Sequence, residues 1–279
     1  MLVSAPFLLS LFILLSILLR TESKKDKRIT LCKFLSFSTT ILTKIILAVG
    51  QLFSKIMISL SSVPHELISI NPIINKSFND TSIPTAVDVD RFETESRELF
   101  VGRNQLCSEL PLIEGQTIID LGAGSGLFME LVSERLGPNG TLICAEPSAK
   151  FCQYMTQRVN ELSNSGQRAH IHIVQTLPHT LIHSDIQMHK IDVVYCIDTY
   201  HHFEYPIEML KSIRATLKPN GLFVIVDFER IPGVTIDRLM EHVRCGKEIV
   251  MNEVESVGFV LVEEKHIFKE NYFLIYRSP

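Results

Sequence analysis

IIDLGAGSG, at residues 118–126, joins a β-rich run to a turn that contains three glycines. The run QTIIDL (116–121) predicts a short buried strand, and the helical spacing of apolar residues from Leu127 to Leu136 predicts the helix that follows. A strand that enters a helix through a glycine-rich turn lets a ligand approach the backbone and the helix N-terminus closely. We therefore expect a ligand site at this turn.

Strand patterns alternate with helix patterns on both sides of the turn. Further strands are predicted at Thr141–Ala145, His170–Gln175, Ile191–Ile197, Leu222–Phe228, Phe259–Glu263 and Tyr272–Tyr276. Helices are predicted at Asp90–Leu110, 148–163, Pro206–Leu217 and about Thr235–Val257. This alternation predicts an α/β fold, with a Rossmann-like, doubly wound, seven-stranded and mostly parallel sheet. The last two strands have no helix between them and predict a C-terminal antiparallel edge hairpin.

Two acidic residues accompany the glycine turn. Asp120 lies two residues before Gly122 and offers a hydrogen-bond acceptor to the same crevice. Glu146 ends the next strand, 20 residues after Gly126, where a carboxylate can bind the hydroxyls of a ribose. Leu127 stands where a dinucleotide fingerprint requires a third small residue, so the GxGxG spacing disfavours NAD.

Four segments of the chain resemble the class I S-adenosylmethionine-dependent methyltransferases: IIDLGAGSG (118–126), CAEPS (144–148), DVVYCIDTYHHF (192–203) and LKPNGLFVIVDF (217–228). The resemblance covers about residues 90–279 and is greatest to small-molecule methyltransferases of the quinone and methyltransferase-11 type. It implies S-adenosylmethionine as cofactor, bound by Asp120, Gly122, Ala123, Gly124, Gly126, Glu146, Pro147, Asp198 and Thr199. The region after the third strand reads VQTL (174–177) and lacks the Asp that contacts adenine in many relatives, so no adenine contact is assigned.

The end of the predicted strand Ile191–Ile197 carries the candidate catalytic residues Asp198, His201 and His202. Methyl transfer needs alignment above all, and a base only where the nucleophile loses a proton as it attacks. The carboxyl end of a central strand is where open α/β sheets bind ligands, so either histidine could be that base or contact substrate. The alternative is that both histidines are structural.

Tyr200 lies in the same segment as His201 and His202 and is a candidate substrate residue. A second candidate cluster contains Asp227, Glu229 and Arg230 at the end of the strand Leu222–Phe228, with His242 and Arg244 on the next helix. Arg230, His242 and Arg244 are candidate substrate residues, because an inserted helix before the last two strands often covers the substrate site in this fold. The alternative is a solvated helix face of mixed charge. No metal is expected: His170, His172, His179 and His183 lack a Cys or acid that would complete a first shell. The six cysteines contain no CxxC pair and are interpreted as reduced thiols.

Residues 1–65 differ in composition from the rest of the chain. Leu2–Leu19 is an uncharged, apolar run of 18 residues, long enough to cross a bilayer as a helix. We interpret 1–65 as a hydrophobic anchor followed by a basic amphipathic segment, 66–89 as a linker and 90–279 as the methyltransferase domain. The basic cluster after Leu19 predicts a membrane protein, single-pass or peripheral, with its catalytic domain in the cytoplasm. A cleaved signal, a second span or a transit segment are the alternatives.

Charge narrows the range of acceptors. The chain has a net charge of −4, with 27 basic and 31 acidic residues, and eight of the basic residues fall within 1–65. An acidic body does not favour nucleic-acid binding, which needs clustered Lys and Arg. We expect a methyltransferase for a small, lipophilic acceptor, with lipids and quinones as candidates. A methyltransferase of a soluble metabolite, or a non-catalytic S-adenosylmethionine-binding regulatory or assembly protein, are the alternatives. The oligomeric state is not predicted.

Overall fold

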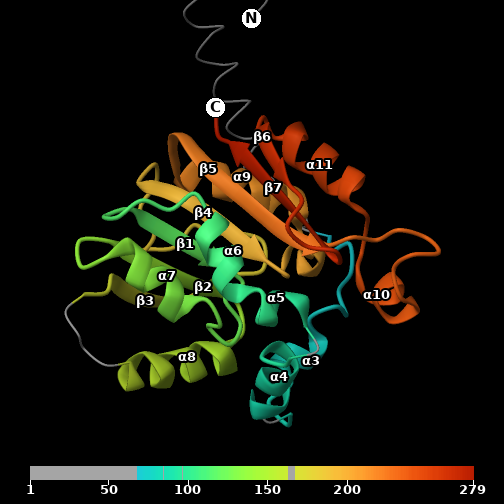
Figure 1. The fold of residues 1–279 in the computed structure, drawn as a ribbon, viewed down its shortest axis with the longest axis horizontal. Helices are drawn as coiled ribbons and strands as arrows, with labels where there is room; N and C mark the ends of the chain where they lie inside the picture. Colours follow the sequence, from blue (N-terminus) through green and yellow to red (C-terminus); the bar gives the residue numbers. More distant parts are fainter. Residues whose placement is uncertain (1–67, 84, 96, 163–166) are drawn as a thin grey trace, which may run out of the picture. The chain divides into compact units, whose positions relative to one another are not determined.

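The computed structural model describes residues 68–83, 85–95, 97–162 and 167–279. A seven-stranded sheet with the order β3-β2-β1-β4-β5-β7-β6 forms its centre (Figure 1). The strands are β1 (Thr117–Leu121), β2 (Thr141–Glu146), β3 (His170–Gln175), β4 (Ile191–Ile197), β5 (Leu217–Phe228), β6 (Val260–Lys265) and β7 (Asn271–Arg277). Strands β1 to β5 pair in parallel, while β7 lies antiparallel between β5 and β6. The predicted Rossmann-like sheet and its antiparallel edge hairpin are confirmed.

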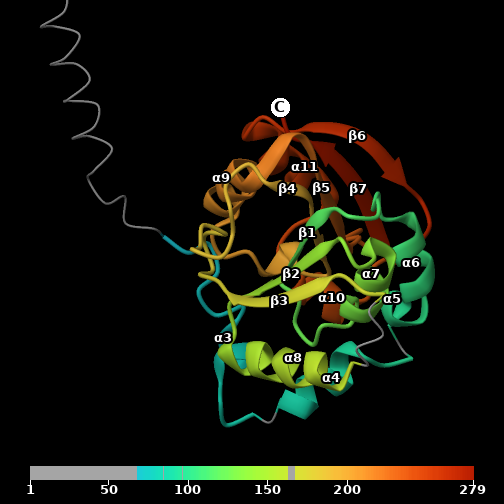
Figure 2. The same cartoon turned by 90° about the vertical axis from the view of Figure 1, so that its left-hand side faces the viewer.

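Helices cover both faces of the sheet. The helices after β1 are α7 (Met129–Leu136), α8 (Ala149–Glu161), α9 (Pro206–Thr216), α10 (Asp237–His242) and α11 (Lys247–Ser256). One apolar core joins α9 and α11 to the face that carries Ile119 and Val194. The other core joins α7 and α8 to the face that carries Ile118 and Val193. Figure 2 shows α9 and α7 on opposite sides of the strands. Alternate residues of a strand point to opposite faces, so each buried strand supplies both cores.

Two predicted helices are interrupted in the structure. The segment predicted as one helix over Thr235–Val257 forms α10 and α11, with an extended backbone at Val243 and Gly246 between them. Arg244 lies in this break and donates to both carboxylate oxygens of Glu253, at 2.8 and 2.7 Å. Bidentate pairs between a guanidinium and a carboxylate are among the stronger hydrogen-bonded contacts in proteins, and this one forms where the helix is interrupted.

The described chain before β1 forms four short helices, namely α3 (Lys76–Asn79), α4 (Thr85–Phe92), α5 (Glu98–Val101) and α6 (Arg103–Glu109). The single helix predicted over 90–110 is divided among the last three of them. The backbone is extended at Arg97, whose guanidinium donates to the Phe92 carbonyl at 2.9 Å and forms an ion pair with Asp198. The helical pattern over 90–110 therefore breaks where a side chain reaches the end of β4.

The segment interpreted as a linker, 66–89, contains α3 and the first part of α4. Phe78 of α3 packs its ring against Phe92, Phe151 and His202, with ring centroids 5.7, 6.1 and 5.2 Å away. Asp88 of α4 is fully buried and pairs with the Lys150 ammonium at 2.8 Å. This part of the chain therefore packs on the methyltransferase-like body.

The predicted anchor and basic segment, 1–65, lie outside the described residues, as does Cys32. Within the described part of the chain, none of the helices has both the length and the apolar character needed to span a membrane.

Candidate functional site

The glycine turn after β1 has the conformation that its sequence suggests. Gly122, Gly124 and Gly126 all have left-handed backbones, with φ of 73°, 54° and 74°. The Gly122 amide donates to the Ala145 carbonyl at 2.8 Å, which fixes the turn to the end of β2. An L side chain rarely adopts these angles. A Cβ on Gly122 would also overlap the side chain of Thr199.

Glu146 ends β2 beside this turn and is only 6% exposed. Its carboxylate accepts hydrogen bonds from the Gly124 amide at 3.0 Å and, across Pro147, from the Ser148 amide at 2.9 Å. Burial raises the pKa of Glu146 to about 7, although both amide bonds favour the charged form. The predicted ribose acceptor is thus a buried carboxyl group held by backbone amides.

Asp120 is a second buried carboxyl group, 3% exposed at the end of β1. Its Oδ2 atom has no hydrogen-bond partner among the described residues. Burial raises the pKa of Asp120 to about 7, and the nearby Glu146 contributes to this rise. A buried polar atom without a partner costs free energy that a bound ligand can recover.

The end of β4 lies against the glycine turn. Thr199 Oγ1 is 3.2 Å from the Gly122 carbonyl oxygen, and Asp198 has a left-handed backbone with φ of 54°. Asp198 forms the ion pair with Arg97, and its Oδ1 atom is buried without a partner in the described part of the chain. Strain and an unpaired polar atom in one residue are typical of functional sites.

His201 and Asp227 form a buried pair at the ends of β4 and β5. His201 is 3% and Asp227 1% exposed. His201 Nδ1 lies 2.7 Å from Asp227 Oδ1, and the His201 amide donates to Oδ2 at 2.9 Å. A carboxylate at this distance places the ring proton on Nδ1 and leaves a lone pair on Nε2. His201 is therefore held in the tautomer that can act as a base.

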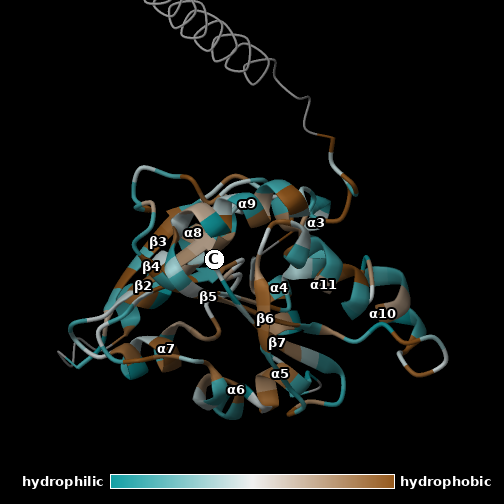
Figure 3. Cartoon of the chain, turned by 90° about the horizontal axis from the view of Figure 1, so that it is seen from above, coloured by the Kyte–Doolittle hydropathy of each residue, from teal (hydrophilic) through white to brown (hydrophobic). Residues whose placement is uncertain are grey.

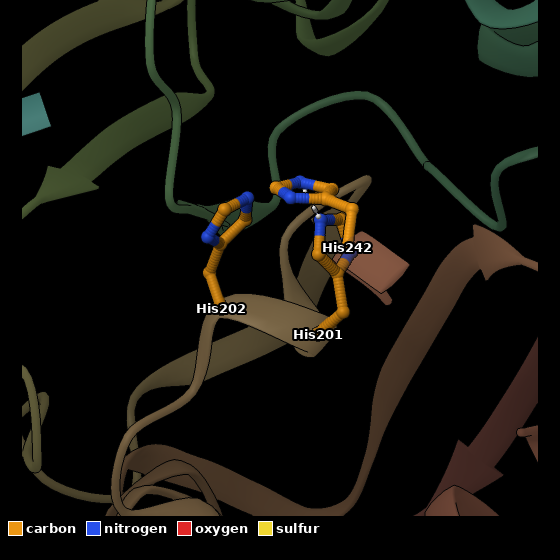
Figure 4. Close-up of side chains that lie close together, drawn as sticks. All are labelled: His201, His202 and His242. Atoms are coloured by element: carbon orange, nitrogen blue, oxygen red, sulfur yellow. Dashed lines mark hydrogen bonds between the residues drawn. The ribbon is translucent and has the colours of Figure 1, made fainter. Parts of the chain in front are cut away.

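His202 and His242 complete a cluster around His201 (Figure 4). The Nε2 atoms of His201 and His242 are 3.2 Å apart, and the His202 ring centroid lies 4.2 Å from that of His201. Burial lowers the pKa of His202 well below its usual range, and burial and His201 lower the pKa of His242. The structure thus brings the predicted substrate residue His242 to the two predicted catalytic histidines.

The other candidate substrate residues make contacts elsewhere. The hydroxyl of Tyr200, which is fully buried, donates to Glu253 Oε2 at 2.9 Å, on the same carboxylate that binds Arg244. Arg230 Nε donates to the Met240 carbonyl at 3.2 Å and supports the loop before α10. These contacts hold α10 and α11 in place.

The sequence placed Asp227 in a second candidate cluster but did not predict its contact with His201, and it did not identify Phe78 at all. Asp227 stands at the carboxyl end of β5, which pairs with β4 through Ile197 and Val226. Carboxyl ends of adjacent parallel strands share one edge of a sheet, so this position was a signal that could have predicted the contact between Asp227 and His201. Phe78 has no comparable signal, because its contact with His202 joins segments far apart in the sequence.

A family model described as a methyltransferase domain matches residues 93–257, more than half of the chain. The chain belongs to the class I S-adenosylmethionine-dependent methyltransferases. The match spans the glycine turn, Glu146 and the histidine cluster, so all of these lie within the matched methyltransferase domain.

Curated methyltransferases with similar sequences have different acceptors in their names. The chain is 30% identical over 134 residues to the mitochondrial ubiquinone biosynthesis O-methyltransferase of Schizosaccharomyces pombe, covering 46% of this chain and 44% of the relative. It is 27% identical over 139 residues to a tRNA U34 carboxymethyltransferase of Campylobacter jejuni, covering 50% of this chain and 44% of the relative. The chain thus spans less than half the length of these relatives.

Solved structures share the fold. A SAM-dependent methyltransferase from Aquifex aeolicus superposes with a TM-score of 0.61 at 18% identity, covering 71% of this chain and all of that one. Phosphoethanolamine N-methyltransferase 2 of Haemonchus contortus, in complex with S-adenosyl-L-methionine, gives a TM-score of 0.57 at 13% identity over 74% of this chain and 60% of that one.

The residues at the glycine turn suit the family's cofactor. S-adenosylmethionine carries ribose hydroxyls, an ammonium group and a sulfonium, and Glu146, Asp120 and Asp198 are acceptors or anions at one sheet edge. The unpaired oxygens of Asp120 and Asp198 are available to such groups. These three residues and the glycine turn would hold the cofactor in this methyltransferase.

Replacement of Gly122 by Ala should destabilise the methyltransferase more than the same change at Gly233. Both glycines have left-handed backbones, with φ of 73° and 77°, but a Cβ on Gly233 meets nothing within 4 Å. Backbone strain alone costs about 1–2 kcal/mol, and the overlap with Thr199 adds about 1–3 kcal/mol. Denaturant unfolding of the two variants measures the difference. Equal losses of stability would contradict the close approach of β1 and β4.

Binding of S-adenosylhomocysteine should weaken as the pH falls below about 7, where Glu146 and Asp120 become protonated. A charged carboxylate can accept hydrogen bonds from both ribose hydroxyls, whereas a protonated carboxyl group must first lose its proton. Below its pKa, each such group therefore weakens binding by about tenfold per pH unit. Affinity should rise with pH and level off above about 8.

Glu146→Gln separates the two carboxyl groups. The variant should bind S-adenosylhomocysteine at least tenfold more weakly at pH 8. Below pH 7, the slope of log affinity against pH should fall by about one, because only Asp120 still has to lose a proton. Calorimetric titration at several pH values measures both quantities. Wild-type affinity that does not change with pH would refute this assignment.

Proposed function

We propose that this chain transfers the methyl group of S-adenosylmethionine to a small, lipophilic acceptor at a membrane. One observation carries the proposal: the glycine turn with Glu146 and the Asp227–His201 pair lie at the same edge of the sheet. One set of residues suits the cofactor, and the other suits an acceptor that loses a proton.

S-adenosylmethionine supplies a methyl group activated by its sulfonium, and the rest of the cofactor leaves as a neutral thioether. The residues of this chain align the acceptor and remove its proton. His201 Nε2 carries the lone pair that accepts the proton as the acceptor attacks the methyl carbon. Asp227 then stabilises the imidazolium, because its carboxylate is hydrogen-bonded to Nδ1 and to the amides of His201 and Phe228.

Two features support a lipophilic acceptor at a membrane. The loop between β5 and α10 exposes Ile231, Val234 and Ile236, with exposed fractions of 44%, 74% and 57%. Figure 3 shows this loop standing out from the body next to α10, the helix that carries His242. The apolar run Leu2–Leu19 adds a segment suited to a bilayer, so we propose that the protein is single-pass or peripheral with its catalytic domain in the cytoplasm.

The alternatives are a soluble metabolite as acceptor, or binding of S-adenosylmethionine without turnover. The names of the curated relatives include both ubiquinone biosynthesis and a tRNA, so they do not select an acceptor. The excess of acidic residues after residue 65 favours a small molecule over a nucleic acid.

Incubation of the full chain with methyl-labelled S-adenosylmethionine and membrane extract should yield a labelled product that partitions into an organic solvent. A lipophilic acceptor keeps its partition after gaining a methyl group, which is itself apolar. Extraction followed by scintillation counting measures the label in each phase. Label only in water-soluble products would refute the lipophilic acceptor, and no label with any extract would refute turnover.

Asp227→Asn should lower kcat by about 10²–10⁴-fold, because the amide stabilises neither the reactive tautomer nor the imidazolium of His201. Binding of S-adenosylhomocysteine should remain within about threefold of wild type, since Glu146 and the glycine turn are unchanged. Asp185→Asn is the matched control, because Asp185 pairs with His183 at 3.5 Å on the exposed surface. Equal activity of the two variants would exclude the Asp227–His201 pair from catalysis.

A further inference from the structure

The fold gathers three histidines that come from two separate segments. His201 and His202 belong to the short helix η1 (Tyr200–His202), and His242 ends α10. A ring nitrogen of each lies within 4.8 Å of a ring nitrogen of the other two. Figure 4 shows the three rings converging. None of them is one of the four histidines between residues 170 and 183 that were considered as metal ligands from the sequence alone.

The spacing of the first two rings matches a shared metal ion. The Nε2 atoms of His201 and His242 are 3.2 Å apart. Two nitrogens bound to one tetrahedral zinc ion at about 2.0–2.1 Å lie about 3.3–3.4 Å from each other. A metal could therefore replace the contact between these nitrogens with little movement of either ring.

Asp227 orients His201 as a carboxylate orients a metal ligand. Ligating histidines commonly donate their other ring N–H to a carboxylate, which fixes the tautomer and makes the ligand more basic. His201 Nδ1 makes this contact with Asp227 Oδ1 at 2.7 Å, so its Nε2 lone pair points toward His242. The alternative group of Asp198, His201 and Asp227 is less suitable, because Arg97 pairs with Asp198 and backbone amides occupy Asp227.

His202 adds a buried nitrogen that needs a partner. Its Nδ1 atom has none in the described part of the chain. A buried polar atom without a partner costs free energy that a bound metal ion can recover.

We propose that His201, His202 and His242 bind one divalent transition-metal ion, such as Zn²⁺, with a coordination position left open for a ligand. Three protein ligands and one open position are the arrangement of catalytic rather than structural zinc sites. Imidazole nitrogens select such ions over Mg²⁺ and Ca²⁺, which prefer oxygen.

The role of the ion rests on the proposed function. The open position would hold the oxygen of a hydroxyl acceptor and lower its pKa. The O–H bond then breaks with release of the proton to water, the oxygen lone pair forms the O–CH₃ bond, and the S–CH₃ electron pair stays on sulfur as S-adenosylhomocysteine leaves. In this state His201 Nε2 is a ligand, so the ion takes over the proton chemistry that His201 performs in the metal-free protein.

Titration with Co²⁺ tests the site directly, because its visible absorption reports coordination independently of methyl transfer. The full chain, stripped with a chelator, should bind one Co²⁺ that Zn²⁺ displaces. His242→Ala should weaken this binding at least tenfold, and because His242 is exposed the variant should keep its fold. Asp227→Asn should weaken it about 10–100-fold.

The double variant His170→Ala/His172→Ala is the matched control, since it removes two histidines from β3 outside the cluster. It should bind Co²⁺ as wild type does. Equal Co²⁺ affinity in wild type and His242→Ala, or loss of binding in the β3 variant, would overturn the assignment. Binding of S-adenosylhomocysteine, measured on the same samples, separates this result from a failure of the proposed function and confirms that each variant is folded.

Discussion

Parallel pairing of β2, β1, β4 and β5 is the constraint on which the site depends. Because these strands run in the same direction, their carboxyl ends meet at one edge of the sheet. Glu146, Gly122, Asp198 and Asp227 each stand at such an end. The Thr199 contact with Gly122 and the Gly122 contact with Ala145 hold neighbouring ends together. Residues 80 or more positions apart thereby become parts of one site.

Burial gives the two halves of this edge different chemistry. Beside the glycine turn, burial raises the pKa values of Asp120 and Glu146 to about 7. In the histidine cluster, burial lowers the pKa values of His202 and His242, which favours their neutral rings. In both cases burial disfavours the charged form of the group. A ligand that supplies the opposite charge, a hydrogen bond or a metal ion offsets the free-energy cost of this burial.

The chain before β1 contributes to the same edge from outside the sheet. Phe78 contacts the His202 ring, and Arg97 forms the ion pair with Asp198. Phe92 lies against Gly124, where an added Cβ would be 3.5 Å from its ring. This segment thus touches both the glycine turn and the histidine cluster, and the break between α4 and α5 coincides with the contacts of Arg97.

The sequence by itself determined the sheet, its hairpin, the glycine turn and the acids beside it, because strand periodicity and glycine spacing are local patterns that burial preserves. It also indicated His201 and His202 through their place after a central strand. The tertiary structure alone decided that His242 joins them and that Asp227 orients His201, since these contacts depend on how β5 and α10 pack. The structure also interrupts the predicted helix at Arg244, whose guanidinium pairs with Glu253, because residues nine positions apart lie on opposite sides of a continuous helix and cannot meet there.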